Sequence, residues 1–327
     1  MAARTLVIGG TLFIGRALVR RLLERGDDVT IMHRGHGTPY GNRVKEVRAD
    51  RNDVRAVRGV LKGRSFDVVY DNVYDFERGT SAEQVMAAAE ATADGLSRYI
   101  FTSSTAVYGE GENHQEDDAL VPASSPNQYA REKAETERAL FRMHRASAFP
   151  AATLRPAFVY GPGNPFYRET FFWDRLLADR PVIIPGDGER RMCFVHVDDV
   201  AVAAIRAADS DSASGRAYNL SSWPPLSQTE LVHALARAAG TTAKLVHVPR
   251  ERIEAAGGNI FQPPFYFAQY YDLPTITQKN DRAREELGVD FTPIDRGLAE
   301  TFEWYQSQTD RAPADFSWED KLLQKLS

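Results

Sequence analysis

The segment QYAREK, residues 128–133, holds a tyrosine and a lysine whose types and spacing could do acid–base chemistry. Tyr129 and Lys133 are four residues apart, so on a helix they would share one face about one turn apart. A tyrosine hydroxyl has a pKa of about 10 in water and is a poor base at neutral pH. A nearby ammonium group favours the phenolate, so this pair could move a proton to or from a substrate oxygen.

A serine lies upstream of this pair, at the end of a predicted strand. The apolar segment RYIFTSS, residues 98–104, ends in Ser103 and Ser104. The carboxyl ends of parallel strands form the sheet edge at which ligands bind. The Ser104 hydroxyl is therefore expected to hydrogen-bond the reacting oxygen of a substrate.

A glycine turn, VIGGTLFIG at residues 7–15, ends the first predicted strand and opens a helix. Such a turn aims backbone N–H groups and the positive end of the helix at a bound pyrophosphate. Leu12 stands where the middle glycine of this motif is usually found, and a plain strand-to-helix turn is the alternative interpretation. We expect Leu12 to push the backbone slightly away from the pyrophosphate. The residues predicted to bind the dinucleotide here are Gly9, Thr11, Leu12, Phe13, Ile14 and Gly15.

The end of the second predicted strand bears on which dinucleotide is bound. NAD-binding folds place an acid there for the ribose 2′-hydroxyl, whereas an arginine suits a 2′-phosphate. This chain has His33 and Arg34 and no acid, so NADP(H) is preferred and NAD(H) stays possible, unless Arg34 is a solvated loop residue. Asp50 is placed to accept a hydrogen bond from the adenine amino group, or else caps a helix or a turn. The other predicted cofactor contacts are Arg51, Asn72, Ser103, Tyr129, Lys133, Pro156 and Val159.

The pattern of apolar runs predicts the elements that position these residues. Helices with apolar positions at helical spacing alternate with short hydrophobic strands, which implies parallel strands joined by crossover helices. We therefore predict an α/β fold, a doubly wound parallel (Rossmann) sheet in a dinucleotide-binding domain over 1–165, with a returning segment near 192–220. A smaller α/β substrate-binding domain is expected over 166–327, in which the aromatic stretch 258–275 resists assignment. The predicted strands are 5–9, 28–33, 45–50, 66–71, 98–104 and 151–156, and the predicted helices are 13–26, 53–63, 81–95, 127–146, 168–180, 196–208 and 227–240.

Composition narrows the class of protein. The 327 residues are 43% hydrophobic and 26% charged with a net charge of −5, which gives no bulk attraction to nucleic acid or to anionic membranes. Arg16, Arg20, Arg21 and Arg25 lie at helix-surface spacing and favour a solvated face over an RNA site. Cys193 is the single cysteine, which fits a reducing compartment, and neither a signal peptide nor a membrane span is expected, so the predicted location is cytoplasmic. No metal site is predicted, since His33 and His36 lie in a glycine loop without a further ligand pattern.

The chain resembles the extended short-chain dehydrogenase/reductases, the NAD-dependent epimerase/dehydratase family. The resemblance runs from about residue 4 to 305 and rests on the glycine turn, SSTAVYG, YAREK, LRPAFVYGPG and FVHVDDVA, in that order. It implies that Ser104, Tyr129 and Lys133 are the catalytic triad and that Lys133 also holds the nicotinamide ribose. The segments GGTLFIG and HRG are similar to those of a subgroup, the chloroplast stem-loop-binding proteins and their bacterial relatives. By analogy with the family, a homodimer is plausible.

Departures from the family pattern reduce the number of reactions and substrates that the resemblance allows. Thr105 and Ala106 stand where 4,6-dehydratases carry an Asp-Glu pair, which argues against dehydration. Phe158, Met192 and Gln269 replace residues with which nucleotide-sugar epimerases grip the substrate diphosphate. Three arginines, unless they are solvated surface charges, could still bind an anionic substrate: Arg168, Arg190 and Arg191.

The expected function is an NAD(P)-dependent epimerase or ketone/alcohol oxidoreductase that acts on a sugar-like small molecule, free or nucleotide-linked. One alternative is an NADPH-dependent reductase of a non-nucleotide carbonyl compound. The other is a non-catalytic or RNA-associated protein on the same fold, against which the intact Ser104, Tyr129 and Lys133 set argues.

Overall fold

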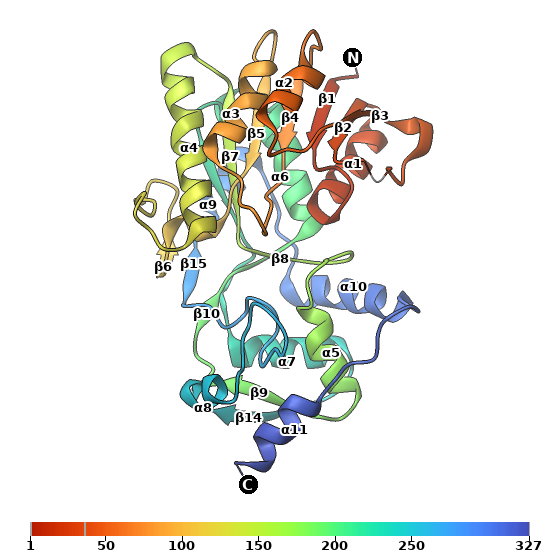
Figure 1. The fold of residues 1–327 in the computed structure, drawn as a ribbon, viewed down its shortest axis with the longest axis vertical. Coiled ribbons are helices and arrows are strands. Elements are labelled where there is room, and N and C mark those ends of the chain that lie inside the picture. The colour runs from red at the N-terminus through yellow and green to blue at the C-terminus, as the bar shows by residue number, and fades with distance from the viewer. Residues whose placement is uncertain (1, 36, 327) are drawn as a thin grey trace. The chain divides into compact units, whose positions relative to one another are not determined.

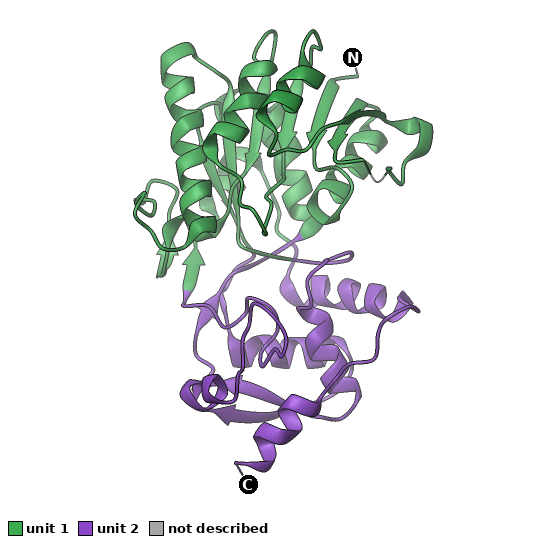
Figure 2. Ribbon diagram, in the orientation of Figure 1, with its two compact units in different colours: residues 1–159, 197–221, 276–291 green, residues 160–196, 222–275, 292–327 purple. Residues whose placement is uncertain are grey.

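The computed structural model describes residues 2–35 and 37–326. The chain forms two compact units, each built from several segments (Figure 2). Unit 1 comprises residues 1–159, 197–221 and 276–291, and unit 2 comprises residues 160–196, 222–275 and 292–327.

Unit 1 is built around a seven-stranded sheet whose neighbouring strands all pair in parallel. The strand order is β12-β7-β5-β4-β1-β2-β3, so the chain builds outward from β1 in one direction and then, from β4 on, in the other. This order confirms the predicted doubly wound sheet. The strands are β1 (Arg4–Ile8), β2 (Asp28–His33), β3 (Lys45–Arg48), β4 (Val68–Asp71), β5 (Arg98–Thr102), β7 (Ala151–Pro156) and β12 (Ala217–Leu220).

Helices cover the sheet in two layers (Figure 1). Helix α1 packs beside α6, while α2, α3 and α4 pack side by side in a second layer. These helices are α1 (Phe13–Arg25), α2 (Val54–Leu61), α3 (Ala82–Ala91), α4 (Gln128–Ser147) and α6 (Val197–Asp209). Short elements complete unit 1, namely η1 (Gly41–Arg43), η2 (Thr105–Tyr108), β6 (Gly111–His114), η3 (Asp211–Ala213), β15 (Ile276–Gln278) and α9 (Asp281–Leu287).

Local sequence fixes where the helices of unit 1 start and stop. Gly26 ends α1 in the left-handed conformation, with φ at +88°, and its N–H group bonds back to the last turn. Ser81 begins α3 with a reciprocal capping box to Gln84. Asn127 caps α4, the helix that carries QYAREK, by accepting a hydrogen bond from the Ala130 N–H at 3.1 Å.

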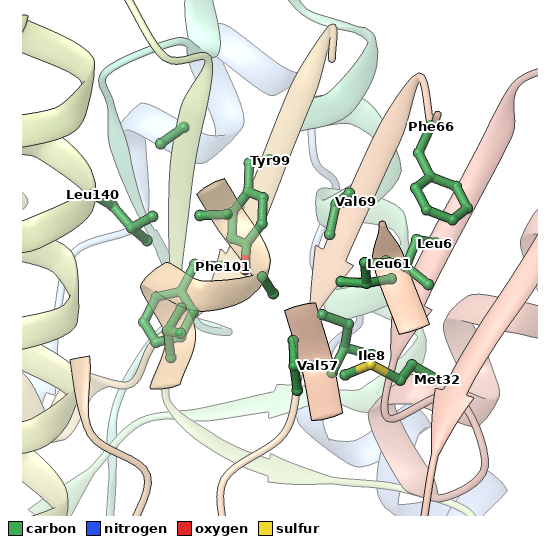
Figure 3. Close-up of a cluster of buried hydrophobic side chains, with 14 of the residues drawn as sticks. Leu6, Ile8, Met32, Val57, Leu61, Phe66, Val69, Tyr99, Phe101 and Leu140 are labelled. Atoms are coloured by element: carbon green, nitrogen blue, oxygen red, sulfur yellow. The ribbon is translucent and has the colours of Figure 1, made fainter. Parts of the chain in front are cut away.

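The apolar faces of α2, α3 and α4 meet the sheet in a cluster of buried side chains (Figure 3). Val57 and Leu61 of α2 point toward Leu6 and Ile8 of β1, and none of the four is exposed to solvent. Burial of side chains of this size contributes roughly 1.5–3 kcal/mol each. This packing holds the strand ends, and therefore the loops that follow them, at fixed positions.

The division of the chain differs from the predicted one in its details. The chain leaves unit 1 after residue 159 instead of 165, returns over 197–221, and returns again over 276–291, which the sequence assigned to the second domain. This second return belongs to unit 1 because β15 pairs in parallel with β6 and because Glu286 of α9 accepts hydrogen bonds from Arg216 (2.7 Å) and Tyr218 (3.0 Å).

Unit 2 combines helices with short strand pairs. Strands β9 and β14 pair in parallel, and β10 and β13 pair antiparallel. The stretch 258–275 forms turns in which the rings of Tyr266, Phe267 and Tyr271 are buried, with Phe267 lying 5.1 Å from Phe172 between ring centroids. Its helices are α5 (Glu169–Leu177), α7 (Gln228–Ala238), α8 (Arg250–Ala255), α10 (Ile294–Ser307) and α11 (Ser317–Gln324). The remaining strands are β8 (Phe158–Tyr160), which begins in unit 1, β9 (Pro181–Pro185), β10 (Arg191–Met192), β11 (Phe194–His196), β13 (Leu226–Ser227) and β14 (Lys244–Val248).

An ion pair is buried inside unit 1 between α4 and β7. The side chains of Glu137 and Arg155 are 0% and 3% exposed, and the guanidinium donates to both carboxylate oxygens at 2.5–3.1 Å. Arg155 also donates to the Tyr108 hydroxyl at 2.6 Å and to the Glu116 carbonyl at 2.9 Å. All of these bonds are made away from water.

We predict that Glu137→Ala destabilises the protein by about 3–5 kcal/mol, because it leaves the Arg155 charge buried without its partner. The control is Glu90→Ala, which breaks a surface pair with Arg58 whose side chains are 51% and 55% exposed, and which should cost less than about 1 kcal/mol. Urea unfolding followed by circular dichroism measures both. Equal losses in the two variants would contradict the argument.

Candidate active site

The candidate site lies at the carboxyl edge of the sheet in unit 1, where β1 and β4 are neighbours and the winding reverses. Ile8 at the end of β1 pairs in register with Asp71 at the end of β4, and the Asn72 N–H donates to the Ile8 carbonyl at 3.1 Å. In doubly wound sheets ligands bind at this reversal. The loops after β1, β2, β4 and β5 leave the sheet from this edge.

Two glycines of the turn after β1 are required by close contacts. A Cβ on Gly15 would lie 1.8 Å from the Gly9 carbonyl oxygen, and one on Gly9 would lie 2.4 Å from Val73 Cγ2. Gly9 also has φ at +86°. Helix α1 can therefore approach the turn closely only with glycine at position 15, and the loop after β4 only with glycine at position 9.

The missing middle glycine has a simple physical reason. Leu12 has φ −133° and ψ 144°, an extended conformation that any residue adopts, and its side chain is 60% exposed. It precedes α1 without a side-chain cap, and the first turn has no acidic residue. The first N–H groups of the helix are thus left without such a cap, as a phosphate-binding turn requires. Thr11, Phe13 and Ile14 belong to the same turn, and Phe13 has φ at +40°.

His33 fixes the loop that carries Arg34. The Gly35 N–H donates to Nδ1 at 3.0 Å, so Nε2 carries the proton and donates to Glu46 at 2.9 Å. The Arg34 side chain is 64% exposed, and its nearest carboxylate is that of Asp75, 3.7 Å away. Arg34 therefore keeps donors that a phosphate could use.

Asp50 has protein partners where the sequence predicted an adenine contact. Its carboxylate accepts from the Asn52 N–H at 2.9 Å and from Arg78 at 2.8 Å, and Arg78 also binds Asp75 at 2.7 Å. Arg78 was not identified from the sequence. With Arg34 it forms a chain of alternating charges, and an adenine contact by Asp50 stays a prediction.

Arg51 is turned into the protein and is only 4% exposed. Its guanidinium binds the buried carboxylate of Asp71 and donates to the Gln84 carbonyl at 2.6 Å. The Tyr99 hydroxyl donates to the same carboxylate at 2.6 Å. These partners give Arg51 a structural role, and its predicted cofactor contact stays a prediction.

Two predicted cofactor residues fit a ligand at the ends of β4 and β5. Asn72 accepts a hydrogen bond from the Thr102 hydroxyl at 2.5 Å, while its Nδ2 group is buried. Ser103 is 2% exposed. Within residues 2–35 and 37–326, neither Asn72 Nδ2 nor Ser103 Oγ has a hydrogen-bond partner. Buried polar atoms are normally paired, so these two suit the polar groups of a nucleotide cofactor. Pro156 ends β7 and Val159 lies in β8, both buried, and their predicted contacts stay predictions.

Lys133 lies beneath Tyr129 as the spacing predicts. Lys133 is 3% exposed, its Nζ donates to the Thr102 carbonyl at 2.7 Å, and it lies 5.9 Å from the centre of the Tyr129 ring. Ser104 follows Thr102 by two residues at the end of β5. Its Oγ accepts from the Ala106 N–H at 3.2 Å, which leaves the hydroxyl hydrogen able to donate. Helix α4 packs on η2, directly after Ser104.

Burial changes the acidity of Lys133. Removal from water lowers its pKa to about 8, and the nearby Asp71 carboxylate opposes that shift. At pH 7 Lys133 is still mostly charged. It therefore places an ammonium group close to the Tyr129 ring.

Three residues of this site were missed by the sequence analysis. Tyr74 and Phe76 lie in the loop after β4, with ring centroids 4.7 Å and 5.6 Å from that of Tyr129, and Tyr74 donates to Glu132 of α4 at 2.8 Å. Burial and the Glu132 carboxylate raise the pKa of Tyr74, which keeps it protonated. Their position just after a predicted strand, like that of Asn72, was the signal that could have found the two aromatic residues.

The three arginines proposed for an anionic substrate lie in unit 2. Arg190 donates to the carbonyl and carboxylate of Asp272 at 2.8 and 3.0 Å, and Arg191 lies 3.4 Å from Glu230. Arg168 is 9% exposed, with its guanidinium 4.6 Å from the Phe166 ring centre. Binding of an anionic substrate by these residues stays a prediction.

In the described part of the chain no helix is long and apolar enough to span a membrane. Among the same residues, no three His, Cys, Asp or Glu side chains are grouped so that they could hold a metal ion. His36, considered above as a metal ligand, lies outside the described residues.

Comparison with known proteins gives one family. Residues 5–221 match the model of the NAD dependent epimerase/dehydratase family. The chain is 29% identical to the chloroplast stem-loop binding protein of 41 kDa b of Arabidopsis thaliana, over 98% of this chain and 84% of that protein. It is also 29% identical to a 2-alkyl-3-oxoalkanoate reductase of Stenotrophomonas maltophilia, over 72% of this chain and 76% of that protein. A solved UDP-glucuronic acid 4-epimerase of Bacillus cereus, in complex with UDP-glucuronic acid and NAD, shares the fold with a TM-score of 0.73 at 20% identity, covering 92% of this chain and 98% of that one.

Lys133→Met should stabilise the cofactor-free protein at pH 7 by on the order of 2–3 kcal/mol, because it removes a buried charge. The pKa of Lys133 falls from 10.5 in the unfolded chain to about 8 in the folded one. Between these values the unfolded state binds more protons, so wild-type stability rises with pH and the gap to the variant closes. Urea unfolding at pH 7, 8, 9 and 10 measures this gap.

The matched control is Lys45→Met, since the Lys45 side chain is 66% exposed in a surface pair with Asp28. Its stability difference from wild type should be small and independent of pH in this range. A constant gap for Lys133→Met over the same range would contradict the assignment of a buried ammonium.

Proposed function

Because the chain belongs to the NAD dependent epimerase/dehydratase family, we propose that it transfers hydride between NADP(H) and a ketone or secondary alcohol of a small molecule. It is an NAD-dependent enzyme of the extended short-chain dehydrogenase/reductase family. The observation that carries the proposal is the placement of Lys133 Nζ 5.9 Å from the centre of the Tyr129 ring, at the sheet edge where Ser104 follows β5 by two residues.

The cofactor would be held by residues at the carboxyl edge of the sheet. The turn from Gly9 to Gly15 would receive the pyrophosphate, and the unpartnered Asn72 Nδ2 and Ser103 Oγ atoms would meet its polar groups. When bound, the nicotinamide supplies or accepts hydride at the substrate carbon. Lys133 would also bond the nicotinamide ribose, as the resemblance implies.

The chain's own residues handle the substrate oxygen. The Ser104 hydroxyl would donate to the carbonyl oxygen and orient it, and Tyr129 would deliver a proton to that oxygen as hydride reaches the carbon. The C=O bond becomes CH–OH, and the reverse reaction returns the proton to the phenolate. The Lys133 ammonium favours this phenolate electrostatically.

Two features support a reductase over a dehydratase or an RNA-binding protein. Thr105 and Ala106 offer no carboxylate for the elimination of water. Three of the four arginines of α1 that could suggest an RNA face are ion-paired: Arg20 and Arg21 bind Asp198 at 2.7 and 3.2 Å, and Arg25 is paired with Asp27 and Asp209. A phosphate backbone would have to displace these partners.

Tyr129→Phe should lower hydride turnover at least about 100-fold, because general acid–base catalysis contributes that much, and should leave cofactor affinity within about twofold. NADPH oxidation with a panel of ketones, read at 340 nm, measures the first quantity, and fluorescence titration with NADPH measures the second. Tyr74→Phe is the matched control, since Tyr74 is held protonated by Glu132 and should lose far less turnover. Full turnover by the Tyr129 variant would contradict the assignment.

Wild type should bind NADPH at least about tenfold more tightly than NADH, because Arg34 has donors to spare for a 2′-phosphate. Arg34→Ala should bring the two affinities within about threefold, whereas Arg4→Ala, at the opposite end of β1, should leave the ratio unchanged. Equal affinities in wild type would contradict the preference. So would NAD(H) released in stoichiometric amount from the freshly purified, denatured protein, which would indicate a retained cofactor and an epimerase.

A further inference from the structure

The loop between β4 and α3, residues 72–81, presents an exposed aromatic ring beside the proposed catalytic tyrosine. Phe76 is 57% exposed, and its ring stacks on that of Tyr129 with an interplanar angle of 23° and a centroid distance of 5.6 Å. Tyr74 lies edge-on to both rings, at 5.2 Å from Phe76 and 4.7 Å from Tyr129. We call these three rings the aromatic shelf.

The shelf is anchored to the catalytic helix through one carboxylate. Glu132 Oε2 accepts from the Tyr74 hydroxyl and from the Thr80 N–H, both at 2.8 Å, and Oε1 accepts from Gln128 at 2.9 Å. Gly79 lies so close to this group that a Cβ would be 2.4 Å from Gln128 Nε2. The loop and α4 therefore fit each other closely.

The loop is also held by bonds of its own. Asp75 accepts from the N–H groups of Glu77 and Arg78 at 3.0 and 2.9 Å, and the Asp75 N–H donates to Thr80 Oγ1 at 3.0 Å. Asn52, just before α2, donates to the Gly79 carbonyl at 2.7 Å. Phe76 is thus exposed on a loop with many fixed bonds, which preorganises its ring for a ligand.

The shelf offers a ligand mainly apolar surface. The Tyr74 hydroxyl is bonded to Glu132, and the Tyr129 hydroxyl is reserved for the reacting oxygen under the proposed function. A sugar ring presents hydroxyl groups that need hydrogen-bond partners when they leave water, whereas an aromatic ring needs only an apolar surface. The shelf therefore favours an apolar ring over a sugar.

We propose that the exposed side of the Phe76 ring, beside Tyr129, packs against the substrate, and that the substrate carries an aromatic ring next to its reacting carbonyl. This inference rests on the proposed function, since it takes Tyr129 as the residue at the reacting oxygen. Phe76 is then a specificity-determining residue, and the nucleotide-sugar substrates of related enzymes are not the preferred class.

The test measures binding in the presence of an oxidised cofactor, which cannot reduce the ketone acetophenone. The full-length protein is saturated with NADP⁺ or NAD⁺, whichever binds more tightly, and titrated with acetophenone or with UDP-glucose by ligand-observed NMR. Wild type should bind acetophenone, Phe76→Ala should weaken this binding about tenfold, and Phe76→Tyr should stay within about threefold of wild type. Leu177→Ala removes an apolar side chain of similar exposure, 52%, on α5 and should have no effect.

The outcomes separate this inference from the proposed function. Nucleotide affinity, measured first, should be the same in all four proteins; a wild type that binds neither nucleotide overturns the proposed function and the shelf's role with it. Nucleotide binding with unchanged acetophenone affinity in Phe76→Ala overturns the shelf alone. The role of the aromatic shelf is also overturned if wild type binds UDP-glucose but not acetophenone, or if Phe76→Ala weakens the binding of both probes equally.

Discussion

A lysine ammonium is buried where β5 ends, and three elements of unit 1 are arranged around it. Lys133 Nζ donates to the Thr102 carbonyl of β5 at 2.7 Å and lies 4.7 Å from the Phe101 ring centre. It also lies 5.4 Å from the Tyr74 ring, which comes from the loop after β4. A charge taken out of water is costly, so these groups must compensate for it in place of solvent. Strand, helix and loop are therefore held together by the same group that lies 5.9 Å from the centre of the Tyr129 ring.

The loop of residues 72–81 contacts two groups of predicted site residues that lie far apart along the chain. In this loop Asp75 is paired with Arg34, and Arg78 is paired with Asp50 and with Asp75. The adenosine end of a cofactor is expected near Arg34 and Asp50. Tyr74 and Phe76 of the loop contact Tyr129. A change of conformation in this loop would therefore alter the charges around Arg34 and the packing of the catalytic ring together.

Much of this site could be predicted from the sequence, because its parts are local. Strand runs, capping residues and the four-residue spacing of Tyr129 and Lys133 depend on near neighbours, and the parallel sheet follows from their alternation. Arg51 and Glu132 could not be predicted in the same way. Their roles depend on partners distant in the sequence, such as Asp71 for Arg51, and nothing in the local pattern distinguishes a buried arginine from one that binds phosphate. The return of residues 276–291 to unit 1 was missed for the same reason.

Among the described residues, buried polar atoms without a hydrogen-bond partner occur at several places in the sheet, Thr5 Oγ1 and Thr153 Oγ1 among them, and four such atoms lie together near one edge. In the part of the chain that the structure describes, Asn72 Nδ2, Ser103 Oγ, Thr105 Oγ1 and Asp71 Oδ1 are buried without a hydrogen-bond partner, and all four lie in β4 or β5 or within three residues of their carboxyl ends. Each such atom costs about 1–3 kcal/mol. A core selected for stability alone would replace them with apolar groups, as it would replace Lys133. Their gathering at the point where the winding of the sheet reverses is therefore best explained by a ligand that supplies the missing bonds.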